Sequence, residues 1–172
     1  MKHSFTPFFL LIVSLCFLTL ASCKHETITN DLNWDLYEFA KKTDGYRWFN
    51  NSNAPLPRSS GSGHSAPLVR TRFNEIATTQ LDSNGRVVSG ITFPEGSVIV
   101  KELLNADESL ERYAILYKQT NNEFSDANGW VWGYLFPDGS VSETALNKGN
   151  SCVGCHAQSG NIDGILMNKY YP

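Results

Sequence analysis

The sequence predicts an α+β protein that is mostly β, with an antiparallel sheet, a helix before the sheet and a short helix after it. Three observations predict this class. One early segment repeats apolar residues at helical spacing, four later segments are rich in β-branched and aromatic residues, and turn-forming clusters separate these segments. The chain has no internal repeats.

The N-terminal segment has the pattern of a bacterial export signal. A short basic start is followed by an apolar run over residues 8–20, which is too short to span a bilayer comfortably. The run ends in Leu-Ala-Ser-Cys at Cys23, which resembles a lipobox, where the chain is cut before a cysteine that receives a lipid. We therefore expect a signal peptide over 1–22, lipidation of Cys23, and a lipid-anchored tether over 23–30. The protein would then be exported and anchored to a bacterial membrane, on the periplasmic side or at the cell surface. An ordinary signal peptide with a chance cysteine is the alternative.

The charge balance argues against a nucleic-acid partner. The whole chain has 14 basic and 17 acidic residues and a net charge of −3. Cleavage after residue 22 removes one basic residue and no acidic one, so the processed chain is mildly acidic. Residues 31–172 are enough for one domain with its own core.

The predicted elements follow in chain order. Leu32 and Leu36 belong to an amphipathic repeat that predicts a helix over 31–42, and Gly45 supplies a stop. Residues 50–67 are rich in Asn, Ser, Gly and Pro and should form a loop. Four strands are then predicted over 68–80, 97–104, 112–119 and 129–136, with turn signals at 82–85 and 137–139.

The strongest motif is C-x-x-C-H at Cys152, Cys155 and His156, the attachment sequence for haem c. Two thiols three residues apart on the first turn of a helix reach the two vinyl groups of the porphyrin, and the adjacent imidazole then points at the iron. Two other cysteines are accounted for, since Cys16 leaves with the signal peptide and Cys23 takes the lipid. We therefore predict one covalent haem c, with His156 as the proximal iron ligand.

Three alternatives compete with haem attachment. A thioredoxin-like redox pair would need a strand before the motif and a long helix after it, and little chain remains. A zinc site would need two further ligands, and His64 alone is a poor substitute. A chance occurrence of the motif is the third alternative.

The other axial position of the iron lacks an obvious strong ligand. Met167 lies a short distance after His156 in the chain, so we expect it to pack beside the haem or in the core. His64 lies in a Gly- and Ser-rich stretch and His25 lies beside the lipid anchor, although either could bind iron in principle. We therefore expect five-coordinate iron, which favours ligand binding or chemistry over simple electron transfer.

Taken together, these residues resemble the cytochrome P460 family, which includes the β-sheet cytochromes c′-beta. The resemblance covers roughly residues 63–168 and rests on Phe-Pro-Glu-Gly-Ser-Val-Ile-Val-Lys-Glu at 93–102, Gly-Trp-Val-Trp-Gly-Tyr at 129–134, and C-x-x-C-H followed by Asp163. It implies a sheet protein, often a homodimer, whose five-coordinate haem binds nitric oxide or oxidises hydroxylamine. The helical cytochromes c′ are disfavoured, because the predicted strands cannot supply four amphipathic helices.

Lys101 occupies the place where P460 enzymes have a lysine bonded to the porphyrin edge, so the resemblance implies a possible cross-link there. From the residues alone, Lys101 either shares a buried strand face with Ile99 and Leu103 or reaches to solvent. A desolvated lysine loses its proton more readily and becomes a nucleophile. Glu143 is the acid nearest before the haem motif and is a weak candidate for a catalytic base.

Other polar and aromatic residues have two interpretations each. The polar residues of the early strand could line the pocket or hold the haem propionates, or could be solvated or paired with one another: Arg70, Arg72, Asn74 and Glu75. The aromatic residues of a late strand could be electron wires or ligand platforms, but their period of two favours sheet core that packs on the haem: Trp130, Trp132 and Tyr134.

Two functions from different classes therefore follow. One is a P460-like oxidoreductase that oxidises hydroxylamine and passes electrons to an exported redox partner. The other is a non-enzymatic nitric oxide binding protein, with simple electron transfer as a third choice.

Overall fold

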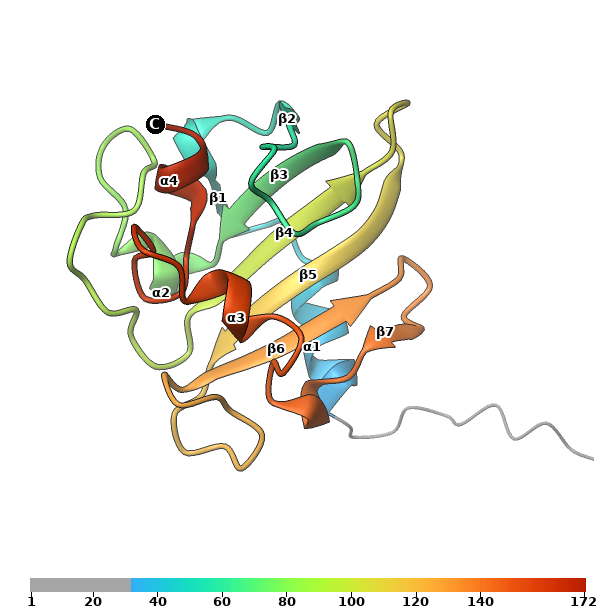
Figure 1. Cartoon of the computed structure of the whole chain (residues 1–172), viewed down its shortest axis with the longest axis vertical. Coiled ribbons are helices and arrows are strands. Elements are labelled where there is room, and N and C mark those ends of the chain that lie inside the picture. Colours follow the sequence, from blue (N-terminus) through green and yellow to red (C-terminus); the bar gives the residue numbers. More distant parts are fainter. Residues whose placement is uncertain (1–31) are drawn as a thin grey trace, which may run out of the picture.

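Seven antiparallel strands form the sheet of the computed structural model, which describes residues 32–172 (Figure 1). The strand order is β1-β3-β4-β5-β6-β7, and β2 pairs with β3 beside β1. The strands are β1 (Arg47–Trp48), β2 (Leu56–Pro57), β3 (Leu68–Phe73), β4 (Val98–Leu104), β5 (Leu110–Lys118), β6 (Trp130–Leu135) and β7 (Val141–Glu143). The helices are α1 (Leu32–Lys41), α2 (Glu75–Thr78), α3 (Val153–His156) and α4 (Met167–Tyr170), with 3₁₀ turns at Phe49–Asn51 and Ala145–Asn147. The predicted class, α+β and mostly β, is confirmed.

The predictions for the N-terminus fall on residues that the structure does not describe. The signal peptide, the lipid site at Cys23, the tether and His25 all lie outside residues 32–172. Within those residues, no helix has both the length and the apolar character needed to cross a bilayer.

One predicted strand is shorter than the sequence suggested. The segment 68–80 was expected to be one irregular strand, but β3 ends at Phe73 and the chain turns into α2. Asn74 causes this change, because its side-chain oxygen accepts hydrogen bonds from the backbone N–H groups of Ala77 (2.9 Å) and Val98 (3.0 Å). The cap thus ends the strand and ties the new helix to β4.

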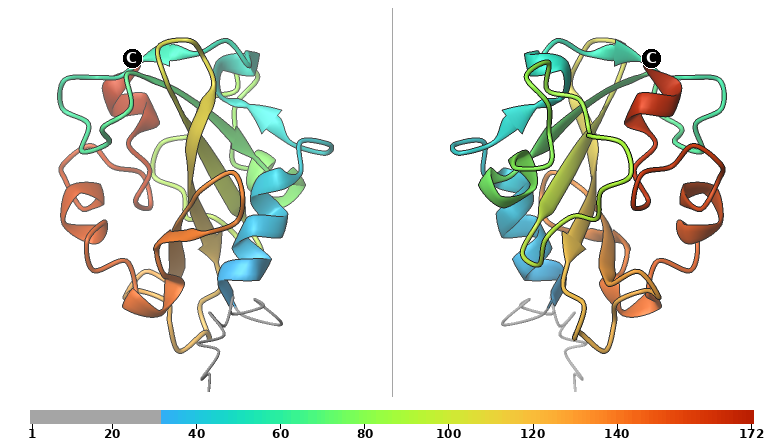
Figure 2. Two further views of the ribbon diagram at one scale, coloured as in Figure 1. Left: turned by 90° about the vertical axis from the view of Figure 1, so that its right-hand side faces the viewer. Right: turned by 90° about the vertical axis from the view of Figure 1, so that its left-hand side faces the viewer.

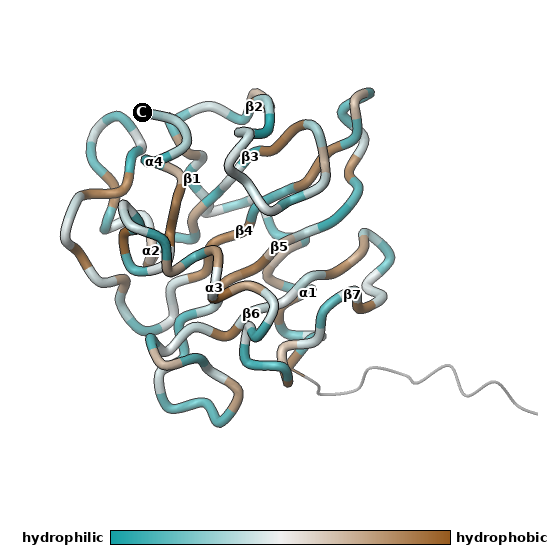
Figure 3. Tube along the Cα trace, viewed as in Figure 1, coloured by the Kyte–Doolittle hydropathy of each residue, from teal (hydrophilic) through white to brown (hydrophobic). Residues whose placement is uncertain are grey.

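Both faces of the sheet are covered, as Figure 2 shows: α1 lies on one side, and the C-terminal segment with α3 and α4 lies on the other. On the first face, Leu36 and Ala40 of α1 pack on the apolar residues of the central strands. On the second face, Trp130 and Trp132 pack with Ile165 and other residues of the C-terminal segment. Burial on both faces explains why β4 is apolar except at Lys101 and Glu102 and why β5 is apolar at its centre, residues 114–116. Figure 3 shows brown stretches on both strands at the centre of the fold.

Candidate functional site

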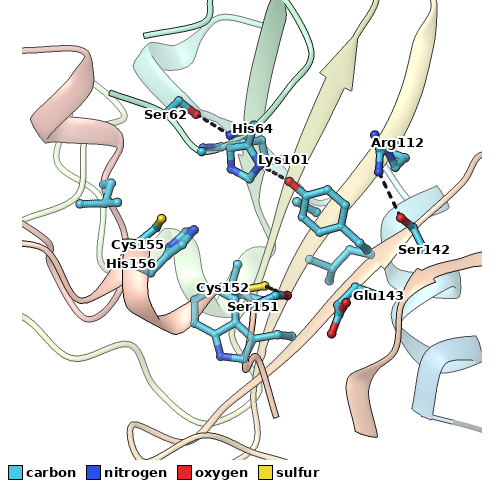
Figure 4. Close-up of a pocket in the computed structure, with 18 of the residues that line it drawn as sticks. Ser62, His64, Lys101, Arg112, Ser142, Glu143, Ser151, Cys152, Cys155 and His156 are labelled. Atoms are coloured by element: carbon cyan, nitrogen blue, oxygen red, sulfur yellow. Dashed lines mark hydrogen bonds between the residues drawn. The ribbon is translucent and has the colours of Figure 1, made fainter. Parts of the chain in front are cut away.

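A cavity of about 330 Å³ lies between the sheet and the C-terminal segment. The loop before β3, the strands β4 to β7 and the segment around α3 contribute its walls (Figure 4). The structure brings together here all of the sequence-predicted site residues among those it describes, together with His64: Lys101, Glu143, Cys152, Cys155 and His156.

The C-x-x-C-H motif forms the single turn of α3, as the sequence predicted. Cys152 caps the turn and its carbonyl accepts the backbone N–H of His156 (3.1 Å), so both thiols and the imidazole lie on one turn of helix. Both thiols are free, and Cys155 is exposed. Burial raises the pKa of the Cys152 thiol. Gly149 lets this segment approach the sheet, because a side chain there would overlap the ring of Trp132.

The imidazole of His156 is held with one nitrogen available. Its Nδ1 lies 2.6 Å from the Gly164 carbonyl oxygen, which can only accept, so Nδ1 carries the proton and Nε2 keeps its lone pair. The Trp132 ring packs edge-on against the imidazole, with centroids 4.8 Å apart. Burial lowers the pKa of His156, which favours the neutral form that binds metals. This is the arrangement of a metal-binding histidine with its outer hydrogen bond already formed.

The carbonyl that orients His156 belongs to a tight turn. Asp163 and Gly164 both have positive φ, between Ile162 and Ile165, which exchange backbone hydrogen bonds of 2.9 Å. The Asp163 carboxylate is fixed in turn by a buried ion pair with Lys118 (3.0 Å) on β5. The sheet therefore sets the position of the imidazole through the turn.

Asp163 also makes backbone-directed contacts with the sheet. Its carboxylate accepts the Phe93 N–H (2.8 Å), and its carbonyl accepts the Trp130 indole N–H (2.9 Å). Asp163 therefore has a structural role in this chain.

Lys101 faces the cavity from the middle of β4, between Thr71 on β3 and Ala114 on β5. The sequence left open whether the Lys101 side chain points to a buried face or to solvent, and in the structure it points into the cavity. No ion pair or hydrogen bond to its amine is present within residues 32–172. Desolvation lowers the pKa of Lys101 to about 8, so a substantial fraction of the amine is neutral and nucleophilic at neutral to mildly alkaline pH.

His64 also enters the cavity, on the side facing His156 (Figure 4). Its Nδ1 shares a hydrogen bond with the Tyr134 hydroxyl. Burial, with the nearby charge of Lys101 as a smaller cause, lowers the pKa of His64 to about 3. The imidazole is therefore neutral across the physiological range.

The early-strand residues do not line the cavity. Arg70 and Arg72 both pair with Glu102, and Arg72 also donates to carbonyls at the end of α1, including that of Lys42 (3.2 Å). Both arginines are therefore paired, but with Glu102 and not with one of the other early-strand residues, and the Arg72 pair lies in the core. Alternation places these side chains on the α1 face of the sheet, opposite the cavity.

Arg112 is the cation that sequence reasoning missed. It lines the cavity from β5, donates to Ser142 (3.1 Å) and to Glu111, and lies over the Tyr134 ring. A signal existed, because Arg112 alternates with Ala114 and Leu116 along one strand face. Which face would border the site could not be known before the sheet was assembled.

The remaining sequence predictions about site residues divide as follows. Trp132 and Tyr134 line the cavity, whereas Trp130 is core with its indole on the Asp163 turn. Met167 is buried in the core, where its sulfur accepts the Thr71 hydroxyl (3.4 Å), and it is not among the residues that line the cavity.

The donor set suits a haem of the c type. Two unbridged thiols and a neutral imidazole lie on one helical turn, beside a cavity with aromatic and apolar walls. Two cations, Lys101 and Arg112, line the same cavity and complement the carboxylates that a haem carries.

The family model for cytochrome P460 matches residues 43–166 of this chain. The chain belongs to the cytochrome P460 family. The match runs from before β1 to just beyond the Asp163 turn, so it includes Lys101 and the whole C-x-x-C-H motif. It begins at residue 43, whereas the resemblance found in the sequence began near residue 63. Membership of the cytochrome P460 family supports a c-type cytochrome and implies haem binding. None of the curated proteins compared with the chain matches it.

Proposed function

We propose that this chain is an exported, mono-haem c-type cytochrome that binds small nitrogenous molecules at its iron and oxidises hydroxylamine. The observation that carries the proposal is Lys101, a desolvated amine that enters the same cavity as His156. A lysine placed so is costly to keep charged and well suited to react. The family resemblance implies the reaction partner, which is the porphyrin edge.

The haem would be held by three residues of one turn. Cys152 and Cys155 would each add a thiol across a vinyl group, and Nε2 of His156 would bind the iron. The bound haem would supply the redox-active iron for the reaction. Joining the Lys101 nitrogen to a porphyrin carbon removes one hydrogen from each atom, so that step requires an oxidant such as a peroxide.

Oxidation of hydroxylamine releases electrons and protons in equal number. The electrons would pass to an oxidised, exported redox protein. Glu143 is the one carboxylate among the lining residues of the described chain, and it is the candidate that accepts a proton. The cavity beside His156 would admit the substrate.

Lys101→Ala provides the test, in full-length protein made in a host that attaches haem c. We expect a strongly red-shifted Soret band in the ferrous wild type, reversion to an ordinary haem c spectrum in the variant, and loss of steady-state hydroxylamine oxidation with an artificial electron acceptor. The control is Lys41→Ala, which removes an exposed lysine from α1 on the other face of the sheet. An ordinary spectrum in the wild type, with no turnover above free haem, would refute the enzymatic proposal.

Nitric oxide binding without turnover is the second candidate, and one contact favours it. Glu143 already accepts a hydrogen bond from the side chain of Asn147 (2.8 Å), which lessens its value as a base. Binding of nitric oxide needs no base. Nitric oxide titration of the ferrous protein, in the absence of turnover, would identify this function.

We also propose that lipid on Cys23 anchors the protein to a bacterial membrane. The residues before α1 would then act as the tether between the bilayer and the haem domain. Cys23→Ser should move the protein from the membrane fraction to the soluble fraction, because no lipid can be attached. Cys16→Ser is the matched control and should leave the protein in the membrane fraction; release of both variants or of neither would contradict the assignment.

A further inference from the structure

Two imidazoles face one another across the cavity. The ring centroids of His64 and His156 lie 6.3 Å apart, with their planes at 75° (Figure 4). Two imidazoles that bind one metal ion from opposite sides, with metal–nitrogen bonds of about 2 Å each, have centroids roughly 6 to 6.5 Å apart. The separation is therefore compatible with two ligands of a single iron.

The outer nitrogens of the two rings are both engaged. His156 gives Nδ1 to the Gly164 carbonyl, and His64 gives Nδ1 to the Tyr134 hydroxyl. In each ring Nε2 is then the nitrogen left for a metal. His156 donates its Nδ1–H to a carbonyl, and His64 donates in the tautomer in which the Tyr134 hydroxyl accepts, which is the tautomer that iron binding requires. The two histidines thus carry matching outer hydrogen bonds, one from each side of the cavity.

The loop that carries His64 is anchored to the haem-bearing segment. The Tyr170 hydroxyl donates to the Gly61 carbonyl (2.7 Å), and the Ser62 hydroxyl accepts the His64 backbone N–H (3.3 Å). A side chain at Gly63 would contact the Cys155 sulfur. The Gly- and Ser-rich composition that suggested a flexible stretch instead permits close packing beside the motif.

We infer that His64 is the second axial ligand of the haem iron in the resting protein, opposite His156, with Tyr134 as its positioning residue. The iron is then six-coordinate at rest, in place of the five-coordinate iron expected from the sequence. A small ligand must displace His64 before it can bind. The inference rests on the proposed function in one respect only, namely that a haem occupies this cavity.

If a ligand has to displace His64 from the iron, its apparent affinity and its binding rate both fall. When a protein group occupies the binding position most of the time, the apparent affinity for an added ligand falls by the fraction of protein in the open state. The rate of ligand binding then levels off at high ligand concentration, at the rate with which His64 leaves the iron. His64 would accordingly regulate access to the site.

The test compares the absorption and near-infrared magnetic circular dichroism spectra of haem-loaded, full-length wild type with those of His64→Ala and His64→Phe. We expect low-spin, bis-histidine iron in the wild type and high-spin iron in both variants, with added imidazole restoring the low-spin spectrum in His64→Ala. Carbon monoxide should bind the ferrous His64→Ala protein faster by roughly tenfold or more, without levelling off. Ser60→Ala, which changes an exposed side chain of the same loop, should keep the wild-type spectrum.

Two results would overturn the inference. One is high-spin iron in the resting wild type. The other is low-spin iron that persists in both His64 variants, which would show that another group such as Lys101 is the ligand. The proposed function can fail independently of this inference. It is refuted if the spectra change as expected but neither the wild type nor a variant binds nitric oxide or oxidises hydroxylamine.

Tyr134→Phe separates ligation from positioning. The variant keeps the His64 imidazole but removes its hydrogen-bond partner, so the iron should remain low-spin while carbon monoxide binds faster than in the wild type. A carbon monoxide rate equal to that of the wild type would remove Tyr134 from the inference.

Discussion

Replacing both Cys152 and Cys155 by alanine is expected to abolish haem that survives denaturation. These are the free thiols of the described chain, and they lie on one turn with the imidazole that would bind the iron. Without the thioether bonds, any haem that still enters the cavity is held only by reversible contacts. Haem-dependent peroxidase staining after denaturing electrophoresis measures the loss, which we expect to be complete.

Gly154→Ala is the matched control for this experiment. It lies between the two cysteines, and a side chain there meets no atom within 4 Å. Its staining should equal that of the wild type. Staining of the double cysteine variant at the wild-type level would show that the haem is not attached through this motif.

Glu102→Ala is expected to cost about 3–5 kcal/mol in the free energy of unfolding. Glu102 pairs with Arg72 in the core, where the two side chains are 6% and 1% exposed, so the variant leaves the guanidinium buried without a counter-charge. Arg72 also joins β3 to the end of α1. A decrease of about 10 °C in Tm, measured by circular dichroism on the haem-loaded protein, corresponds to this cost.

The surface pair of Glu38 and Lys41 provides the comparison. Its side chains are 37% and 43% exposed, so Glu38→Ala should change the unfolding free energy by less than about 1 kcal/mol. Arg72→Met combined with Glu102→Leu should recover much of the lost stability, because neither charge remains buried. Equal effects of Glu38→Ala and Glu102→Ala would contradict this account.

The long strands could be predicted from the sequence because each carries many β-branched and aromatic residues between turn signals. The bounds of the central strands β4, β5 and β6 lie within two residues of the predicted segments. β1, β2 and β7 have only two or three residues each, too few for any periodicity to show. The cap at Asn74 was missed because the β-branched residues that follow it, Ile76, Thr78 and Thr79, are also typical of a strand.

The local part of the site could be predicted, and the long-range part could not. Cys152 and His156 belong to a contiguous motif whose chemistry depends only on spacing. The orientation of Lys101 stayed open because both faces of β4 are buried, so alternation alone could not distinguish them. His64 and Arg112 reach the cavity only through the path of a loop and the pairing of strands, which the sequence does not encode locally.

Strands β3 to β7 are neighbours in the sheet in the same order as along the chain. Each strand can therefore pair with the one that precedes it as the chain folds, without waiting for distant residues. The segment with Cys152 and His156 follows all of these strands in the chain. The strands that carry Lys118 and Trp130, the residues that bind the Asp163 turn, can therefore be paired before that segment folds. Assembly thus ends with the closing of the cavity, and until that moment both thiols remain open to chemistry on an extended chain.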